Sequence, residues 1–396
     1  MASQTESKRR SSSDPYPSRV MNPAFCLAIV LAGALSFSVM GTGLAAARES
    51  VLEAKNAAET KGYIFETSHD EIVAKARKEG RIKALTGLDP GTFSHMIESF
   101  KKKYPFIDLE LAEITGPDAA QRFVMELKSG TAQGWDTANV STEFYPDYAP
   151  FAKKFDILGM AEHGVLGIAP KMIDPKDRAI VSLTSGVSVP VYNKKLISAD
   201  KVPDKWEDFL KPEFKGRKFM VDIRPHIFAA FSACPEQGLG VEWAMKLARG
   251  LRDQEPVWFR GNSRAIRAVH NGEYPLHFAT HYQSIVRAMK KDPTGTLQFK
   301  LIEPVPLRLG NTEMVLNSAP HPYASLLLIE HFASPKGQEI IDKHYPSIAS
   351  VFSPSSHLAK FLKGKKHCVS GFADFHKSAK WMAMAVEAFG FPKAEK

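Results

Sequence analysis

The stretch RIKALTGLDPGTFSHMIESFKKKYPFIDLEL (residues 81–111) contains the alternation of elements that decides the fold class. Its first six residues, RIKALT, are predicted to form a strand, and residues 87–91 a turn. The next apolar side chains recur at helical spacing and predict one buried helix face: Phe93, Met96, Ile97, Phe100 and Tyr104. Pro105 ends this helix, and residues 107–111 form the next strand. This order predicts parallel strands that are covered by helices.

The same alternation extends along the rest of the chain. A helix that begins with the capping box of Ser68 and Glu71 precedes the stretch. Further helices are predicted at 119–127, 241–251, 263–269 and 322–332, and Ser334-Pro335 opens another. Further strands are predicted at 135–141, 187–192, 218–222, 275–279, 299–302 and 313–316. Since single cores seldom grow beyond about 250–300 residues, we predict an α/β fold with two lobes.

The first 47 residues have the layout of a secretory signal peptide. Four Lys or Arg residues precede the continuous apolar stretch AFCLAIVLAGALSFSVM (residues 24–40). Ala45 and Ala47 then form a small-residue cleavage pattern. We therefore predict a signal peptide over residues 1–47 and a mature protein in the periplasm. A retained membrane anchor is the alternative, and Met21 is an alternative start.

The composition is that of an ordinary globular protein. The chain has 396 residues, of which 44% are hydrophobic and 24% charged, and its formal net charge is +9. This charge falls to +7 without residues 1–47, because that segment holds four basic and two acidic residues. Both signs are abundant, so the charge does not favour a nucleic-acid-binding protein. Cys234 and Cys368 follow the signal peptide, and an oxidising compartment permits a disulfide between them but leaves the pairing open.

Several motifs in the second half of the chain resemble one protein family. VSVPVYNKKLI (residues 187–197) and VPDKWEDFLKPEFKGRKFMVD (residues 202–222) combine an apolar strand that ends in Tyr-Asn with a Trp-containing helix and a Lys-Gly pair before a strand. GNSRAIRAVHNGEYPL (residues 261–276) and NSAPHPYASLLLIEHFASPKGQEIID (residues 317–342) complete the set. Together they resemble the bacterial extracellular solute-binding proteins of ABC importers, in the branch with ferric-iron, thiamine and phosphonate binders.

This resemblance implies a two-lobed periplasmic binding protein fold (type II), with the ligand in a cleft between lobes that close over it. The first lobe is expected to take residues 48–186 and 298–332, and the second residues 187–297 and 333–396 with the C-terminal helices. The implied function is capture of a small polar or anionic organic solute for an ABC permease and, through it, its ATPase. The implied protein is a monomer that has no cofactor, binds no nucleic acid and catalyses no reaction.

Loops at the carboxyl ends of strands indicate the ligand site, because ligands of open α/β sheets bind beyond these ends. Five loops satisfy this rule: residues 86–89, 141–145, 184–188, 222–224 and 280–282. Helix N-termini beside such loops direct free N–H groups at an anion, and Arg224 is expected to add a bidentate clamp. The predicted ligand-binding residues are Ser141, Glu143, Tyr145, Asp222, Arg224, His281 and Tyr282.

Ferric iron is the alternative ligand. The iron-binding branch of the resembling family holds the ion with adjacent tyrosines in a loop that corresponds here to HFATHYQS (residues 277–284). Tyr282 is present, but His281 stands where the first tyrosine is expected, so an iron site would use Glu143, His281 and Tyr282. His277 and His281 have a spacing that binds metals on a helix, but this segment is expected to be the end of a strand.

A secreted hydrolase is the remaining alternative. Neither HExxH nor GxSxG occurs in the chain, and the sequence around Ser188 is not a nucleophile elbow. Scattered Ser, His and Asp side chains can still converge in a fold, so this class is disfavoured by the sequence and left to a turnover assay.

Overall fold

The computed structural model describes residues 49–114 and 116–391, so the predicted signal peptide lies outside the described residues. The chain divides after Glu53, and the architecture below is that of residues 54–391. Within the described ranges, no helix has the length and apolar character needed to cross a membrane.

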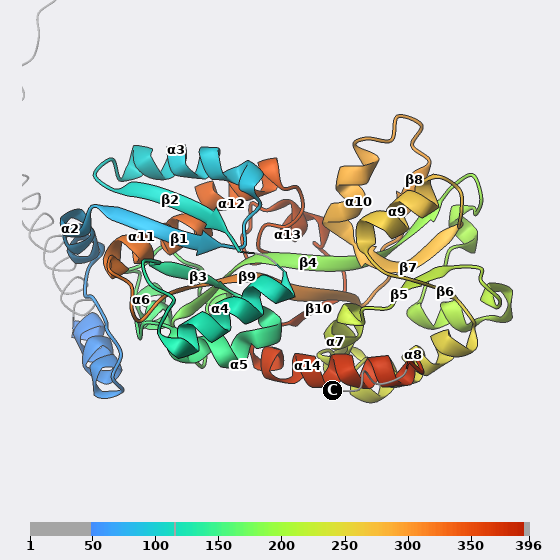
Figure 1. Cartoon of the computed structure of the whole chain (residues 1–396), viewed down its shortest axis with the longest axis horizontal. Helices are drawn as coiled ribbons and strands as arrows, with labels where there is room; N and C mark the ends of the chain where they lie inside the picture. Colours follow the sequence, from blue (N-terminus) through green and yellow to red (C-terminus); the bar gives the residue numbers. More distant parts are fainter. Residues whose placement is uncertain (1–48, 115, 392–396) are drawn as a thin grey trace, which may run out of the picture. The chain divides into compact units, whose positions relative to one another are not determined.

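Ten strands form one sheet in the described part of the chain, and eight of them follow one another along a single path of pairing (Figure 1). The order along this path is β2-β1-β3-β9-β4-β7-β5-β6, with β10 beside β9 and β8 beside β4. The strands are β1 (Arg81–Thr86), β2 (Asp108–Glu113), β3 (Thr137–Val140), β4 (Ile180–Asn193), β5 (Met220–Asp222), β6 (Val257–Phe259), β7 (Leu276–His281), β8 (Leu297–Phe299), β9 (Val305–Val315) and β10 (His367–Ser370).

The two longest strands, β4 and β9, connect the two halves of this path. The first part of β4 pairs with β9, from Ile180 to Val187, and the second part pairs with β7 and β8. The outer strands pair in parallel, β1 with β2 and β3, and β5 with β6 and β7. Each antiparallel ladder between the named strands includes β4 or β9. The predicted α/β class is therefore confirmed, and the predicted parallel pairing occurs among the outer strands, whereas the two crossing strands add antiparallel ladders.

Helices cover both faces of the sheet (Figure 1). They are α2 (His69–Glu79), α3 (Phe93–Lys103), α4 (Pro117–Ser129), α5 (Tyr145–Tyr148), α6 (Ile157–Glu162), α7 (His226–Ser232), α8 (Val241–Asp253), α9 (Asn262–His270), α10 (Tyr282–Met289), α11 (Pro322–Ala333), α12 (Pro335–His344), α13 (His357–Phe361) and α14 (Phe372–Ala388).

Strand β5 shows how the sheet separates two cores, because successive side chains of a strand point to opposite faces. Val221 joins a core with α7, α8 and α14, which also contains Trp206 and Phe278. Its neighbour Met220 joins the opposite core, with α9 and α10. Both faces of this half of the sheet are thus buried under helices, which leaves the ends of the strands for a site.

Several helix starts have the predicted caps. The Ser68 hydroxyl accepts a hydrogen bond from the Glu71 N–H (3.3 Å), and the Glu71 carboxylate accepts one from the Thr67 N–H (3.1 Å). Ser334 caps α12 by accepting from the Gly337 N–H at 3.1 Å, with a proline at the first helical position. Both starts satisfy N–H groups that would otherwise lack partners. The predicted helix starts at Ser68 and Ser334 are confirmed.

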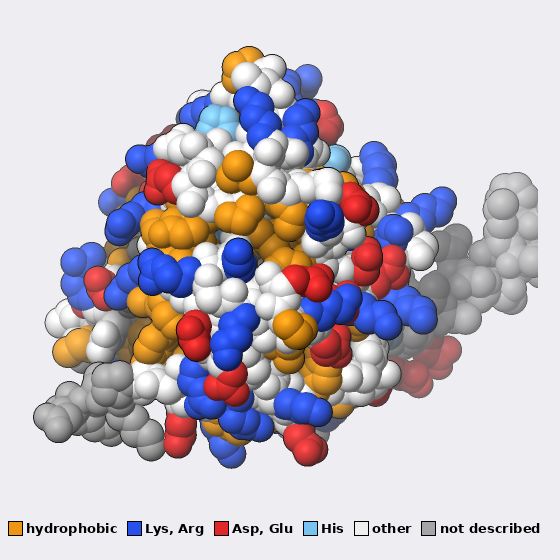
Figure 2. Space-filling view, turned by 90° about the vertical axis from the view of Figure 1, so that its right-hand side faces the viewer, with side chains coloured by type: hydrophobic (Ala, Val, Ile, Leu, Met, Phe, Trp, Pro, Cys, Tyr) orange, Lys and Arg blue, Asp and Glu red, His pale blue; other side chains and the backbone are white. Residues whose placement is uncertain are grey.

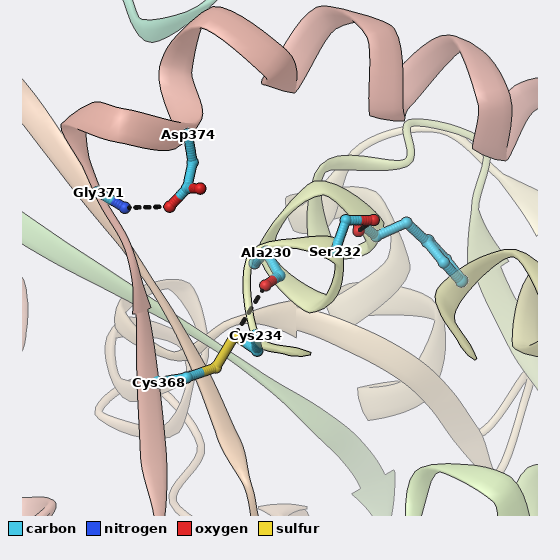
Figure 3. The surroundings of a disulfide bond; sticks show 7 residues. Ala230, Ser232, Cys234, Cys368, Gly371 and Asp374 are labelled. Atoms are coloured by element: carbon cyan, nitrogen blue, oxygen red, sulfur yellow. Dashed lines mark hydrogen bonds between the residues drawn. A yellow bond between two sulfur atoms is a disulfide. The ribbon is translucent and has the colours of Figure 1, made fainter. Parts of the chain in front are cut away.

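Cys234 and Cys368 form a disulfide, the pairing that the sequence left open (Figure 3). Cys234 follows α7 and Cys368 lies on β10, and their Cα atoms are 5.8 Å apart. Both side chains are buried. The bond therefore joins the loop after α7 to a strand that pairs in parallel with β9.

The predicted boundaries of the lobes stay a prediction. One element bears on them: α12 packs against α3 and α11, which the prediction assigns to the first lobe, although it assigns residues 333–396 to the second. Helix α14 packs against α7 and α8, which the prediction assigns to the second lobe, and also against α5, which it assigns to the first.

Candidate functional site

A cavity of about 410 Å³ lies where the carboxyl ends of β3, β5 and β7 meet the crossing strands β4 and β9. Four of the five predicted loops line it, namely residues 141–145, 184–188, 222–224 and 280–282. The crossing strand β9 adds residues 308–311. The cavity is therefore at the carboxyl-end position that is expected for a ligand of an open α/β sheet.

Two arginines line this cavity. Arg308 comes from the middle of β9 and Arg224 follows β5, while Glu143 is the one carboxylate among the described lining residues. Burial lowers the pKa of Arg308, and the charge of Glu143 opposes this effect. No side-chain hydrogen bond or ion pair of Arg308 occurs within the described ranges. Because a guanidinium stays charged, its donors are free for a ligand with anionic oxygens.

Asp222 holds Arg224 in place. Arg224 donates from Nε to Asp222 Oδ1 (3.0 Å) and from Nη2 to Oδ2 (2.6 Å), so the pair is bidentate. Asp222 also accepts a hydrogen bond from the Gly261 N–H (3.3 Å). Burial acts to raise the pKa of Asp222, but the hydrogen bonds from Arg224 outweigh it and hold that pKa below its usual range. The carboxylate thus positions the arginine.

Two histidines line the cavity beside the arginines. Burial, with the charge of Arg308 as the next cause, lowers the pKa of His226 to about 4 and that of His281 to about 3. The Asn262 side-chain nitrogen lies 3.1 Å from His281 Nδ1, and the Asn262 oxygen accepts from the Thr280 hydroxyl (3.1 Å). Both imidazoles are therefore neutral near pH 7, where they offer hydrogen bonds rather than charge.

Three buried polar atoms of the lining have no hydrogen-bond partner among the described residues. They are Asn139 Oδ1, His226 Nδ1 and Gln283 Oε1. His226 Nδ1 lies 3.9 Å from Glu143 Oε1, which is too far for a hydrogen bond. Since buried polar groups nearly always have partners, polar atoms of a bound molecule would complete this set.

The fifth predicted loop, residues 86–89, serves a different purpose. The Thr86 hydroxyl (2.7 Å) and the Gly87 N–H (3.3 Å) both donate to Oε1 of Glu313, a fully buried residue of β9. Burial raises the pKa of Glu313 to about 7, although these hydrogen bonds oppose the rise. This loop therefore holds a buried carboxyl group and does not line the cavity.

A family model for "Bacterial extracellular solute-binding protein" matches residues 167–377, which are more than half of the chain. The chain belongs to this family. The predicted resemblance is thereby confirmed at the level of the family. Comparison with curated proteins finds no match.

Solved structures of other solute-binding proteins have the same fold. Ferric iron-binding protein A of Mannheimia haemolytica, in an open conformation, is 16% identical, with 79% of this chain and 100% of that chain covered and a TM-score of 0.62. Iron-bound HitA of Pseudomonas aeruginosa is 16% identical, with 78% of this chain and 99% of that chain covered and a TM-score of 0.55. An ABC transporter substrate-binding protein of Bradyrhizobium japonicum is 16% identical, with 77% of this chain and 99% of that chain covered and a TM-score of 0.59. The predicted two-lobed α/β fold of the periplasmic binding proteins is confirmed.

The structure of this solute-binding protein brings four of the seven predicted residues together in the cavity. Ser141, Glu143, Arg224 and His281 line it. Asp222 lies behind Arg224 and lines a smaller adjoining cavity that shares Arg224 and His281. These five residues come from the ends of β3, β5 and β7.

Tyr145 and Tyr282 do not line the cavity. Tyr145 is fully buried, and its hydroxyl donates to the Asp174 carboxylate. Tyr282 is 5% exposed, and its ring stacks on Phe361 with centroids 4.6 Å apart. Each tyrosine begins a helix, and the first turn of that helix directs the ring into a core instead of toward the loop. The proposed ferric set of Glu143, His281 and Tyr282 is therefore not brought together.

Several lining residues were missed by the sequence analysis. His226 is two residues beyond the loop at 222–224, so a wider window after β5 would have found it. Arg308, Asn311 and Asn139 lie within strands, whereas the rule used for the prediction considers only the loops at the carboxyl ends of strands. Only the antiparallel register of β9 against β3 and β4 brings these residues to the cavity.

Replacing His281 with glutamine should change the pH dependence of stability. In the folded protein, the pKa of His281 is lowered to about 3 by burial, whereas an unfolded histidine titrates near 6.5. At intermediate pH the unfolded chain thus binds one more proton, and stability falls as the pH falls below about 6.5. In the variant, the slope of unfolding free energy against pH between about 4.5 and 5.5 should decrease by about 1.4 kcal/mol per pH unit.

Chemical denaturation at several pH values measures this slope. The exposed residue His367 provides the matched variant His367→Gln, which should keep the slope of the unaltered protein. Equal slopes in the His281→Gln variant and the unaltered protein would show that His281 takes up its proton in the folded state.

Proposed function

We propose that this solute-binding protein captures a small organic anion, such as a carboxylate or phosphonate, in the cavity between β3, β5, β7 and the crossing strands. The observation that carries the proposal is the free guanidinium of Arg308, which faces the cavity beside Arg224 with one lining carboxylate, Glu143. Arginine forks match the geometry of carboxylate and phosphate groups. The neutral His226 and His281 and the unpaired side-chain oxygens of Asn139 and Gln283 add hydrogen bonds that select the rest of the molecule.

The partner in this proposal is an ABC permease, which receives the solute and is driven by its ATPase. The mature protein begins near residue 48 after signal-peptide cleavage, works in the periplasm as a monomer, and carries out no chemistry. The cleft closes between two lobes, for which the sequence predicts residues 48–186 with 298–332 and residues 187–297 with 333–396. The packing of α12 against α3 favours a boundary after α12 instead of before it.

Ferric iron is the competing ligand, because the iron-bound HitA of Pseudomonas aeruginosa and a Trichodesmium protein in complex with iron and citrate share this fold. Two features of the cavity speak for the organic anion. No tyrosine is among its described lining residues, and no group of three or more His, Cys, Asp or Glu side chains within the described ranges is arranged to hold a metal ion. The charge of Arg308, which has no side-chain partner among the described residues, would also repel a cation.

Native mass spectrometry of protein purified from the periplasm without refolding tests the proposal, together with metal analysis of the same sample. We expect one organic anion per chain and no stoichiometric metal. Stoichiometric iron with a visible tyrosinate charge-transfer band would show that the ligand is ferric ion and not an organic anion. Conversion of the recovered solute during incubation would instead indicate a hydrolase.

Removing the Tyr282 hydroxyl should leave the affinity for the recovered solute unchanged. The Tyr282→Phe variant keeps the stacking on Phe361, and Tyr282 is not among the residues that line the cavity. Isothermal titration calorimetry should give a Kd within about twofold of that of the unaltered protein. A loss of affinity of tenfold or more would show that Tyr282 belongs to the ligand site.

A further inference from the structure

A second, basic groove of about 600 Å³ lies between α9, α10 and the end of α12. We call it the basic groove. Among its described lining residues are no Asp or Glu side chains, two histidines (His270 and His344) and five cations: Arg267, Arg287, Lys290, Lys291 and Lys343. The residues of this groove are different from those that line the solute cavity. It is therefore a separate concentration of positive charge.

Most of these cations have no counterion. Arg287 Nη1 lies 3.8 Å from Asp89, and its Nη2 donates to the Tyr345 hydroxyl (3.3 Å). His270 lies 3.3 Å from the buried Asp292. The other four, Arg267, Lys290, Lys291 and Lys343, make no ion pair or side-chain hydrogen bond within the described part of the chain. Like charges gathered in a concave surface focus a positive potential into it.

Helix ends explain how the protein tolerates this charge. Arg267 lies in the last turn of α9, Arg287 in the last turn of α10 and Lys343 in the last turn of α12. Cations are stabilised there by the negative end of the helix dipole, which amounts to roughly half a charge. Three such ends do not neutralise five full charges. The groove keeps a net positive charge that a multivalent anion can offset.

The basic groove also lies between two groups of elements. Helix α12 packs against α3 and α11, whereas α9 and α10 pack against β4 and β7. Figure 2 shows the face beside α9 and α10, where Lys and Arg side chains are spread over the surface with Asp and Glu side chains among them. The segment after α12 continues to Ile348, which lines the solute cavity. An anion in the groove would thus contact both groups at once.

We propose that the basic groove is a second binding site, for a multivalent phosphate-type anion that bridges Lys343 of α12 to Arg267 of α9 and to Lys290, which follows α10. Arginine and lysine are the side chains that bind phosphate oxygens. The volume of about 600 Å³ accommodates several linked phosphate groups, which match the spread of the five cations better than a single monovalent ion. The proposal is independent of the solute that the cavity takes.

Titration with tripolyphosphate tests this site, by isothermal titration calorimetry at roughly 0.1 M salt, where the screening length is about 10 Å. We expect saturable binding of one ion to the groove. The variant Lys290→Gln/Lys291→Gln/Lys343→Gln should weaken this binding at least about tenfold, as expected for loss of charged hydrogen bonds. The control Lys171→Gln/Lys201→Gln/Lys380→Gln removes the same charge from exposed positions elsewhere and should retain it.

The solute cavity also contains an arginine without a side-chain partner among the described residues, so the variant Arg308→Ala assigns the ion to one site or the other. Groove binding should persist in Arg308→Ala. Loss of binding in Arg308→Ala with retention in the triple groove variant would place the anion in the cavity and overturn the proposal. If the groove variant and the control variant lose the same amount of affinity for tripolyphosphate, the net charge of the protein explains the binding and the proposal is overturned. Absence of binding to tripolyphosphate, with binding only to vesicles that contain anionic phospholipid, would overturn it in favour of a membrane surface.

Discussion

Replacing Arg308 with alanine is expected to weaken binding of the recovered anion by about a hundredfold or more. The guanidinium faces the solute cavity from β9 without a side-chain partner among the described residues. A hydrogen bond to a charged group contributes roughly 1.5–3 kcal/mol, and a guanidinium can offer two such bonds to one carboxylate or phosphonate. Since about 1.4 kcal/mol corresponds to a tenfold change in Kd, losing both gives this factor.

The stability of the ligand-free protein should not fall in this variant. Burial lowers the pKa of Arg308, which means that the folded protein holds this charge at a cost. Removing the charge relieves that cost, so thermal unfolding without ligand should show an equal or higher midpoint. The combination of weaker binding and unchanged stability distinguishes a ligand-binding residue from a structural one.

Arg260 provides the matched control, because it is an exposed arginine outside the lining of the cavity. The variant Arg260→Ala removes the same charge and should keep the affinity within about twofold. If Arg308→Ala binds the solute as tightly as Arg260→Ala does, the anion does not contact Arg308. The proposed ligand class would then lose its main support.

The parts of the fold that the sequence predicted are those with local signals. The helix before β1 begins at Ser68 because the Ser and Glu of a capping box satisfy free N–H groups on their own. The helix after His321 begins at Pro322, where the ring fixes a backbone angle that suits a first turn. Such signals depend on residues a few positions apart, so they can be seen without knowing the fold.

The site was predicted where it depends on strand ends, and missed where it depends on strand pairing. Ser141, Arg224 and His281 follow or end strands, and the rule of carboxyl ends finds them. Arg308 lies in the interior of β9, and it reaches the cavity because β9 runs antiparallel to β4 with Arg308 opposite Gly186. Register between strands that are more than 100 residues apart is not encoded in any short pattern, so no local reading of the sequence could have placed Arg308.

The prediction that Tyr145 and Tyr282 face the ligand did not anticipate their burial, for a related reason. A loop that leads into a helix contains positions that face the cleft and positions that face the core, and the sequence does not tell them apart. His281 is the last residue of β7 and lines the cavity, whereas Tyr282 is the first residue of α10 and packs on Phe361. One step along the chain at the start of a helix rotates the direction of the side chain by about 100°. This rotation is enough to direct one side chain into the cavity and the next into the core.

Removing the disulfide should lower the free energy of unfolding by roughly 2–5 kcal/mol. Cys234 and Cys368 are 134 residues apart in the sequence, so the bond closes a long loop in the unfolded chain. The loss of entropy on closing a loop of that length corresponds to about 5 kcal/mol, the upper end of the expected range. Urea unfolding of the Cys234→Ala/Cys368→Ala variant measures the effect, and a midpoint equal to that of the unaltered protein would contradict it.

Reduction of the unaltered protein provides the control for the packing that the alanine substitutions change. Cys234 is fully buried and Cys368 is 6% exposed, so a reductant reaches the bond only when this region opens. Dithiothreitol should therefore leave the folded protein intact for long periods but lower the urea midpoint once unfolding exposes the bond. The double alanine variant should not respond to dithiothreitol. Since Cys234 follows α7 and Cys368 lies beside β9, the bond ties the helices next to β5 to a crossing strand, and its loss should loosen that connection first.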